Sequence, residues 1–276
     1  MYADLHLHTT FSDGSDTPAE MFGLAAQSGV TVISITDHDS VAAYGTLPDE
    51  GSRYGIKLIS GTEISVYSNK KPIHILGYYI NPFASILNEL IVKMSAEATE
   101  STRINFNRVL SLGVFDYSWN RVLDLFPAQP RISGVRIVKA LETDGIQIPG
   151  MKLWDMFHKY FWPMNDDYVD VFTTTPANAI DAIKAAGGIP AIAHPGAIGD
   201  DRIVADLILS GLQGIEAYHP IHSEEETAKY ISMAETNGMF ITGGTDWHGA
   251  NNGTNITHFA MCGLNHSDYA ILKYLA

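Results

Sequence analysis

The beginning of the sequence carries two histidines whose spacing suits the binding of one metal ion. Residues 3–8 are Ala-Asp-Leu-His-Leu-His, an alternation of apolar and polar residues that is typical of a β-strand. His6 and His8 are therefore expected on the same face of that strand, where both imidazoles can reach a common ion. Taken alone, the motif is equally compatible with two polar side chains on a half-buried strand.

Four further stretches place a histidine or a carboxylate directly after an apolar run that predicts a strand. They are Thr36-Asp37-His38-Asp39, Gly61-Thr62-Glu63, Ala193-His194-Pro195 and Thr245-Asp246-Trp247-His248-Gly249. Parallel barrels carry their active sites at the C-terminal ends of the strands, so these side chains are expected to converge. The candidates at or near strand ends are His6, His8, Asp13, His38, Glu63, His74, His194, His219, Asp246 and His248.

This donor set predicts a metal centre. Imidazole and carboxylate ligands suit zinc, manganese or iron, and a cluster this rich, without cysteine, fits two or three ions better than one structural zinc. Three other histidines, His158, His258 and His266, lie in helical or terminal segments and are not expected to bind metal. His222, in the loop after His219, is intermediate.

The segments that must position these residues alternate between strands and helices. Apolar runs predict strands at residues 2–8, 30–36, 57–64, 73–80, 189–193, 212–218 and 239–242. Helix starts are marked by capping boxes at Thr17 and Ser223, and by Thr175 followed by proline. The alternation is typical of a parallel α/β fold, and the number of strands favours a barrel over an open sheet.

Residues 82–175 interrupt this alternation and are predicted to form an inserted helical subdomain that covers the active site. The barrel then comprises residues 1–81 and 176–276. Helices are expected within the insertion at residues 86–112, 119–125, 135–141 and 152–161. The insertion contains Arg103, Arg108, Arg121, Arg131 and Arg136. Most of these arginines are expected on solvated helix faces, and a minority could turn inward as an anion clamp.

Length and composition narrow the class of protein. At 276 residues, the chain is large enough for one α/β barrel or two smaller domains. The formal net charge of −14 argues against an extended nucleic-acid-binding surface, although not against a phosphorylated small molecule. The single cysteine, Cys262, excludes an internal disulfide and suits a reducing cytoplasm. No signal peptide or membrane-spanning segment is recognisable in the sequence.

As a set, the motifs resemble those of the PHP (polymerase and histidinol phosphatase) family, which is related to the amidohydrolase barrels. The matching stretches span nearly the whole chain and lie at residues 4–9, 36–39, 61–63, 193–195 and 244–249. The insertion and the Glu-Ala-Tyr-His-Pro stretch at 216–220 further resemble the stand-alone, metal-dependent phosphoesterase branch. The resemblance implies a distorted seven-stranded (β/α) barrel of the PHP type, up to three divalent ions and phosphoester hydrolysis.

The resemblance also implies nine metal ligands, and this chain has a residue of the matching type at each position. They are His6, His8, Asp13, His38, Glu63, His74, His194, Asp246 and His248. One ion (Mn, Fe or Zn) would be held by His6, His8, Glu63 and Asp246. A second would be held by Asp13, His38 and His248, and a third by His74 and His194 with Glu63 as the bridge.

The expected chemistry is attack on a phosphoester by a hydroxide that bridges two of the ions. Arg131 or Arg136 is the candidate phosphate clamp. This assignment departs from the family pattern, because residues 133–136 are Ser-Gly-Val-Arg where many relatives have Arg-Pro-His. His219 is the candidate to protonate the leaving alkoxide or to hold the phosphate, and Asp246 is assigned a catalytic role in addition to that of a ligand.

The expected substrate is a small phosphorylated metabolite, in particular a nucleotide with a mono-, bis- or cyclic phosphate. Two other classes remain open. Amide or lactone hydrolysis, as in the wider amidohydrolase group, would need no arginine clamp. A non-catalytic, metal-stabilised module would bind a partner without turnover, but the intact ligand set and the lack of a polymerase-sized domain argue against it. The sequence does not indicate an oligomeric state.

Overall fold

Two compact units make up the chain. The computed structural model describes residues 2–47, 53–68, 71–127, 129–250, 258–265 and 267. The barrel unit comprises Met1–Ser68, Ile73–Leu90 and Thr175–Ala276, and the helical unit comprises Asn69–Pro72 and Ile91–Thr174. The helical unit thus begins later than residue 82, the predicted start of the insertion. The predicted position of the insertion over the active site stays a prediction.

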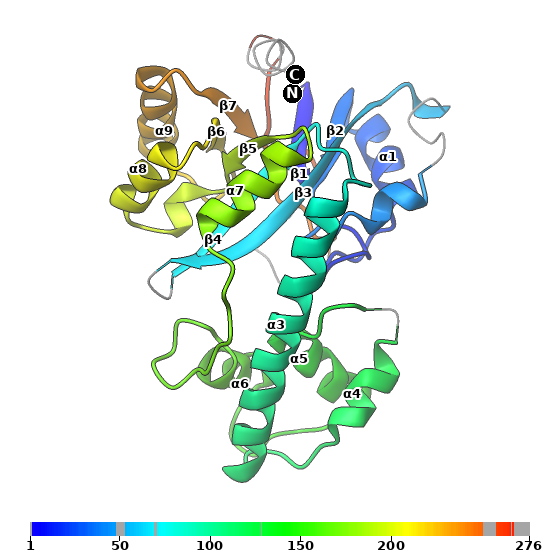
Figure 1. Cartoon of the computed structure of the whole chain (residues 1–276). Helices are drawn as coiled ribbons and strands as arrows, with labels where there is room; N and C mark the ends of the chain where they lie inside the picture. The colour runs from blue at the N-terminus through cyan, green and yellow to red at the C-terminus, as the bar shows by residue number, and fades with distance from the viewer. Residues whose placement is uncertain are drawn as a thin grey trace. The chain divides into compact units, whose positions relative to one another are not determined.

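The barrel unit is built on a sheet whose strands are ordered as in the sequence, from β1 to β7 (Figure 1). The strands are β1 Ala3–Leu7, β2 Val32–Ile35, β3 Lys57–Ser68, β4 Lys71–Tyr78, β5 Ile189–Ile192, β6 Gly214–Tyr218 and β7 Phe240–Gly243. Beyond the end of β7, Trp247 forms a parallel bridge with Leu7, and its carbonyl accepts a hydrogen bond of 2.9 Å from the N–H of His8. These contacts bring the two edges together, so the sheet is a nearly closed barrel. The predicted seven-stranded α/β barrel is confirmed.

One strand corrects the expectation of a parallel sheet. The pairs β1–β2, β2–β3, β5–β6 and β6–β7 are parallel, whereas β4 is antiparallel to β5. Only residues 69 and 70 separate β3 from β4, and a parallel crossover requires a dozen or more residues. The beginning of β4 therefore lies beside the end of β5, where the N–H of Ala193 donates a 3.0 Å hydrogen bond to the carbonyl of His74. The reversal brings His74 to the rim that holds the strand ends.

Three helices of the barrel unit begin at the capping residues that the sequence predicts. The described helices of this unit are α1 Pro18–Gln27, α7 Pro176–Ala185, α8 Asp201–Leu209 and α9 Glu224–Thr236, with short 3₁₀ helices at Ala42–Gly45 (η1) and Pro195–Ala197 (η2). The capping boxes of Thr17 with Glu20 and of Ser223 with Glu226 are both present. Thr175 caps α7 and forms a box with Asn178. The sequence also predicts a helix around residues 48–54, most of which lie outside the described residues.

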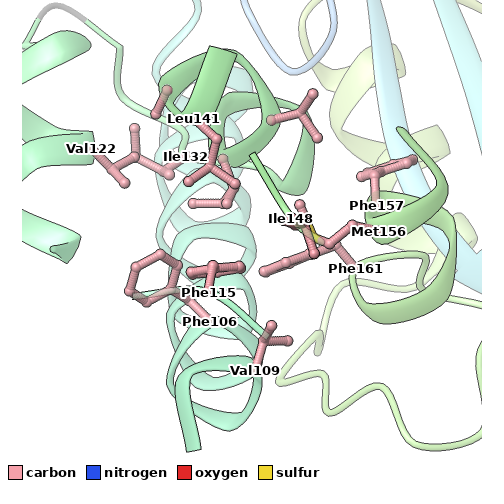
Figure 2. Packing of buried hydrophobic residues seen from close by; sticks show 13 residues of the cluster. Phe106, Val109, Phe115, Val122, Ile132, Leu141, Ile148, Met156, Phe157 and Phe161 are labelled. Carbon is pink, nitrogen blue, oxygen red and sulfur yellow. The ribbon is translucent and has the colours of Figure 1, made fainter. Parts of the chain in front are cut away.

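The helical unit has an apolar core of its own. It contains most of α3 Ser85–Ser111, together with α4 Trp119–Leu125, α5 Gly134–Thr143 and α6 Leu153–Tyr160, so the four predicted helices are confirmed. Figure 2 shows Phe106 and Phe115 within a cluster of buried apolar side chains, and their ring centroids lie 5.4 Å apart. Among the described helices, none combines the length and apolar character that a membrane crossing requires.

Candidate metal centre

Glu63 lies at the centre of the predicted site. It belongs to β3, and its side chain is completely buried. Its Oε2 atom lies 3.2 Å from Nε2 of His6 and 3.1 Å from Nε2 of His8. The same oxygen lies 3.0 Å from Nδ1 of His38, which follows β2. The end of β1 therefore directs both of its imidazoles to one carboxylate oxygen, as the alternation in the sequence predicts.

The second oxygen of Glu63 faces a different pair of imidazoles. Oε1 lies 3.0 Å from Nδ1 of His74 on β4 and 3.2 Å from Nε2 of His194, which follows β5. The two oxygens of one carboxylate thus face two different sets of imidazoles. This arrangement is the one that a carboxylate bridging two ions requires.

Asp246, just after β7, completes the group around His6 and His8. Its Oδ1 atom lies 3.3 Å from Nε2 of His6 and 3.0 Å from Nε2 of His8. Its Oδ2 atom lies 3.5 Å from Nε2 of His219, whose side chain is 2% exposed. Asp246 therefore links the predicted ligands to the predicted general acid.

Asp13 and His248 lie on the other side of His8. Nε2 of His248 is 3.3 Å from Oδ1 of Asp13, and Nδ1 of His8 is 3.9 Å from the same oxygen. The rings of His8 and His248 stack with their centroids 4.1 Å apart, and the ring centroid of His38 lies 4.4 Å from that of His8. His8 therefore stands between two sets of donors.

The potential ligand atoms of the described residues fall into overlapping groups, each with all its atoms within 4.8 Å of one another. The groups are His6, His8, Glu63 and Asp246; His8, Asp13, His38 and His248; His38, Glu63 and His74; and His6, Glu216 and His219. The first matches the predicted first set, and the second adds His8 to the predicted second set. In the third, His38 stands where the prediction has His194. The nine predicted ligands thus lie together, and their division among ions stays a prediction.

Several buried polar atoms at the centre have no hydrogen-bond partner among the described residues. They are Nε2 of His6, both ring nitrogens of His8, Nδ1 of His38 and of His74, Oε2 of Glu63 and Oδ1 of Asp246. An unsatisfied buried polar atom costs roughly 1–3 kcal/mol, and a bound ion is one of the few features that account for such atoms. Converging imidazole and carboxylate donors fit divalent ions such as Mn, Fe and Zn. The residues present therefore fit a metal centre.

The imidazoles around Glu63 favour the ionised form of its carboxylate. Burial alone would raise the pKa of Glu63, but the imidazoles of His38, His6 and His74 hold it well below its usual range. For His8 the balance is reversed, because burial lowers its pKa while the adjacent carboxylates of Asp246 and Glu63 raise it to about 10. A cation that binds here must displace protons from such imidazoles, so metal binding is expected to release protons.

Buried carboxylates hold the loops that carry the ligands. Asp37 accepts hydrogen bonds from the N–H and hydroxyl of Thr9, both at 2.7 Å, and from the hydroxyl of Ser12 at 2.6 Å. These bonds fix the loop that leads to Asp13. On the opposite side, Asp4 accepts bonds from the N–H and hydroxyl of Thr245 at 2.9 and 2.6 Å.

The backbone at two predicted ligands is in the left-handed region that residues other than glycine seldom adopt. The φ angle is +26° at His194 and +53° at Asp246. Such conformations cost about 1–3 kcal/mol each and concentrate at functional sites. Gly244 permits the close approach of this segment to β1, because a Cβ atom there would lie 2.4 Å from the backbone nitrogen of His6.

Glu216 is the site residue that the sequence interpretation missed. It lies in the middle of β6, is completely buried, and its Oε1 atom is 2.9 Å from Nδ1 of His6. The imidazole of His6, with that of His219, holds the pKa of Glu216 below its usual range although burial raises it. The signal was available, because a glutamate between Ile215 and Ala217 is the one charged residue of an otherwise apolar strand.

The predicted arginine clamp belongs to the helical unit. The guanidinium of Arg136 lies over the ring of Phe126, 5.1 Å from its centroid, and Arg131 acts electrostatically on Tyr168. Their role toward a substrate stays a prediction. Neither His158 nor His258 belongs to the groups of potential ligands among the described residues, as expected, and His266 lies outside those residues.

The chain is similar in sequence to known phosphatases, phosphodiesterases and exoribonucleases. Residues 4–117 match the family model of the PHP domain. The phosphoribosyl 1,2-cyclic phosphate 1,2-diphosphodiesterase of Eggerthella lenta is 29% identical over 256 residues, which cover 90% of this chain and 95% of that protein. The 3',5'-nucleoside bisphosphate phosphatase of Chromobacterium violaceum is 27% identical, with coverage of 91% and 88%. The 5'-3' exoribonuclease Rnm of Escherichia coli is 27% identical, with coverage of 89% and 84%.

A solved structure shares the fold over almost the full length. The crystal structure of a protein assigned as a metal-dependent phosphoesterase from Bifidobacterium adolescentis superposes with a TM-score of 0.82. The match covers 98% of this chain and 95% of that chain, at 24% sequence identity. The likeness establishes the architecture of the barrel and its insertion at the level of the fold.

Proposed function

We propose that this chain, whose residues 4–117 match the PHP domain model, hydrolyses a phosphoester of a small, nucleotide-like molecule at the centre around Glu63. The observation that carries the proposal is the surrounding of one buried carboxylate by five histidines. Its two oxygens lie 3.0 to 3.2 Å from imidazole nitrogens of His6, His8, His38, His74 and His194.

Two to three divalent ions of the Mn, Fe or Zn class are proposed for this centre. Glu63 would bridge two of them, because its two oxygens face separate imidazoles. The other proposed ligands are His6, His8, Asp13, His38, His74, His194, Asp246 and His248. When bound, such ions supply an activated water at neutral pH and neutralise the charge of a phosphate.

His219 is proposed to hold the proton that the leaving group needs. The N–H of Ile221 donates a 3.3 Å hydrogen bond to Nδ1 of His219. In a neutral imidazole the proton then resides on Nε2, the atom that faces Oδ2 of Asp246 at 3.5 Å. Asp246 can therefore orient a ring whose N–H donor points toward the proposed ligands. As a general acid the ring must be the imidazolium, in which Nδ1 also carries a proton, so Nδ1 then gives up the hydrogen bond from Ile221 while Nε2 supplies the proton to the leaving oxygen.

The substrate class is proposed from the chemistry that the relatives share. The relatives from Eggerthella lenta and Chromobacterium violaceum act on a cyclic phosphate of a phosphorylated ribose and on a nucleoside bisphosphate, as their names state. Both substrates combine a sugar with more than one phosphate. A small molecule of this kind also suits a chain with a formal net charge of −14, because a polyanion would be repelled by an acidic surface.

A substrate panel with the ion supplied tests this proposal. The purified protein would be loaded with manganese, zinc or iron and given nucleoside monophosphates, 3',5'-bisphosphates, ribose cyclic phosphates and a short 5'-phosphorylated RNA. Release of phosphate, or opening of the cyclic ester, is expected on a sugar phosphate with two phosphate groups. Glu63→Gln is the matched control, because it keeps the side-chain volume and removes the bridging charge.

Each outcome of the panel decides between classes. Preference for the RNA would move the proposal toward the activity named for the exoribonuclease relative. Turnover of amide or lactone substrates alone would assign the centre to the wider amidohydrolase chemistry. Full metal occupancy without turnover on any ester would indicate a metal-stabilised binding module.

A further inference from the structure

We propose that Glu216 is a positioning residue that orients two of the proposed metal ligands, His6 and His194, without binding an ion itself. The inference rests on the ligand set proposed above and adds a residue that this set does not contain. Glu216 lies on β6, has no exposed surface, and directs its carboxylate to both of the other residues.

The contact with His6 fixes which nitrogen of that ring is free to bind. Oε1 of Glu216 lies 2.9 Å from Nδ1 of His6. A carboxylate can only accept a hydrogen bond, so the ring proton is held on Nδ1. Nε2 is left as the donor atom, and it faces Oε2 of Glu63 at 3.2 Å and Oδ1 of Asp246 at 3.3 Å. A carboxylate behind a ligating imidazole commonly sets its tautomer and orientation in metal sites.

The contact with His194 acts on the backbone. Oε2 of Glu216 accepts a 2.7 Å hydrogen bond from the N–H of His194. His194 has φ +26° and ψ 59°, a conformation that needs support from its surroundings. Its Nε2 atom lies 3.2 Å from Oε1 of Glu63. One carboxylate thus holds a proposed ligand from β1 and another from the turn after β5, and these two imidazoles face different oxygens of Glu63.

Hydrogen bonding distinguishes a positioning role for Glu216 from that of a ligand. His6, Glu216 and His219 are close enough to hold an ion of their own, with potential ligand atoms within 4.8 Å. However, both oxygens of Glu216 and Nδ1 of His6 already take part in hydrogen bonds. By contrast, Nε2 of His6, Oε2 of Glu63 and Oδ1 of Asp246 have no such partner among the described residues. These three atoms, rather than those of Glu216, are therefore the ones proposed to bind an ion.

Glu216→Gln is the informative substitution because glutamine keeps the shape but has a single acceptor oxygen. Two donors, Nδ1–H of His6 and N–H of His194, compete for that oxygen, so one contact fails in either orientation of the amide. The metal-free variant would be titrated with zinc and with manganese, and the affinity and number of ions measured. We expect affinity to fall about 10- to 100-fold, the usual effect of removing such a partner, with the number of ions unchanged at saturation.

Two controls separate positioning from other roles. Thr242→Val changes the residue paired with Glu216 in the neighbouring strand, where the hydroxyl of Thr242 contacts the Tyr78 hydroxyl at 3.0 Å, and should leave metal affinity unchanged. Glu63→Gln removes a proposed ligand and should reduce the number of ions. If Glu216→Gln also loses an ion at saturation, Glu216 is a ligand. If it binds metal like the wild type and only unfolds more easily, its role is structural.

A measurement on the unaltered protein covers the case in which the variant does not fold. Long-range proton–nitrogen NMR spectra of the zinc-loaded protein report which nitrogen of His6 carries the proton. We expect a protonated Nδ1 and a metal-bound Nε2, whereas a metal-bound Nδ1 would overturn the proposal. Neither measurement uses a phosphoester, so their outcome is independent of whether the proposed substrate class is right.

Discussion

The two units of the chain bury side chains of opposite character. The core of the helical unit is made of apolar side chains, among them Phe106 and Phe115, whose ring centroids lie 5.4 Å apart (Figure 2). The centroid of the completely buried Phe106 ring also lies 5.3 Å from that of Trp119. The rim of the barrel unit instead buries charged and polar groups, with no exposed surface left on Glu63 or Glu216. The first core is an apolar cluster, whereas the second brings together imidazole and carboxylate groups that could hold metal ions.

The free energies of the two arrangements differ in sign. Burying a large apolar side chain stabilises a fold by about 1.5–3 kcal/mol. A buried nitrogen or oxygen without a hydrogen bond destabilises it by roughly 1–3 kcal/mol, and the centre around Glu63 contains several such atoms. If the proposed ions bind there, we expect the stability of the barrel unit to depend on them and that of the helical unit not to.

Removal of the metal is the largest perturbation of this contrast. Chelation of the loaded protein should abolish phosphoester turnover and destabilise the barrel unit by several kcal/mol, because an ion at about a thousand times its Kd contributes about 4.1 kcal/mol. Hydrogen exchange followed by mass spectrometry would locate the effect. Exchange should accelerate in β1, β3 and β7 and stay unchanged in α4, α5 and α6.

The reverse perturbation serves as the control. Phe106→Ala should destabilise the helical unit by about 3–5 kcal/mol and leave the number of bound ions unchanged. Leu112→Ala, at a side chain that is 59% exposed, should change neither the stability of the helical unit nor the number of bound ions. Uniform acceleration of exchange over both units after chelation, or none, would contradict the assignment of the two kinds of core.

The same contrast explains what could be predicted from the sequence. The apolar periodicity and capping residues of the helices are local signals, so α4 was placed at the residues that it occupies. The ligand motifs are also local, because each lies at the end of its own strand. The sequence names His74 as a candidate ligand, but only the topology explains its place at the rim, because the reversal of β4 brings the beginning of this strand beside the end of β5.

Long-range pairings lay beyond the sequence. The contact of Glu216 with His6 joins residues 210 positions apart, and no spacing rule connects them. The position of His8 between two sets of donors also depends on a long-range pairing, the closure of β7 onto β1. The sequence interpretation places His8 in one set only. Sequence motifs therefore do not identify Glu216 as a partner of His6. They also do not show that His8 is shared between two sets of donors, because these donors come from distant strands.

His219 offers the next largest test, within the polar region. His219→Asn should lower turnover of an alkyl phosphate about a hundred- to ten-thousand-fold, because a general acid aids the departure of a poor leaving group to that extent. The loss on p-nitrophenyl phosphate should be much smaller, since p-nitrophenolate leaves without a proton. Asparagine can retain the acceptor for the N–H of Ile221, so the loop should keep its conformation.

Metal content must be measured in parallel with the two rates. An equal loss on both substrates would assign His219 to phosphate binding. A loss of metal would instead make His219 a ligand, which its position with His6 and Glu216 permits. Only a selective loss on the alkyl ester at constant metal content supports the acid.

The smallest expected effect concerns whether an arginine of the helical unit binds the substrate phosphate. If the guanidinium of Arg131 or Arg136 binds the substrate phosphate, its replacement by alanine removes a charge-assisted hydrogen bond of about 1.5–3 kcal/mol, or roughly ten- to a hundred-fold in turnover. Lysine should rescue little, because it lacks the planar fork that binds two oxygens.

Arg103→Ala is the matched control, since Arg103 pairs with Glu100 on the exposed surface of α3. Metal content and the stability of the helical unit should stay unchanged in all of these variants. Wild-type kinetics for both Arg131→Ala and Arg136→Ala would show that the clamp lies elsewhere and would leave the helical unit with a purely structural part.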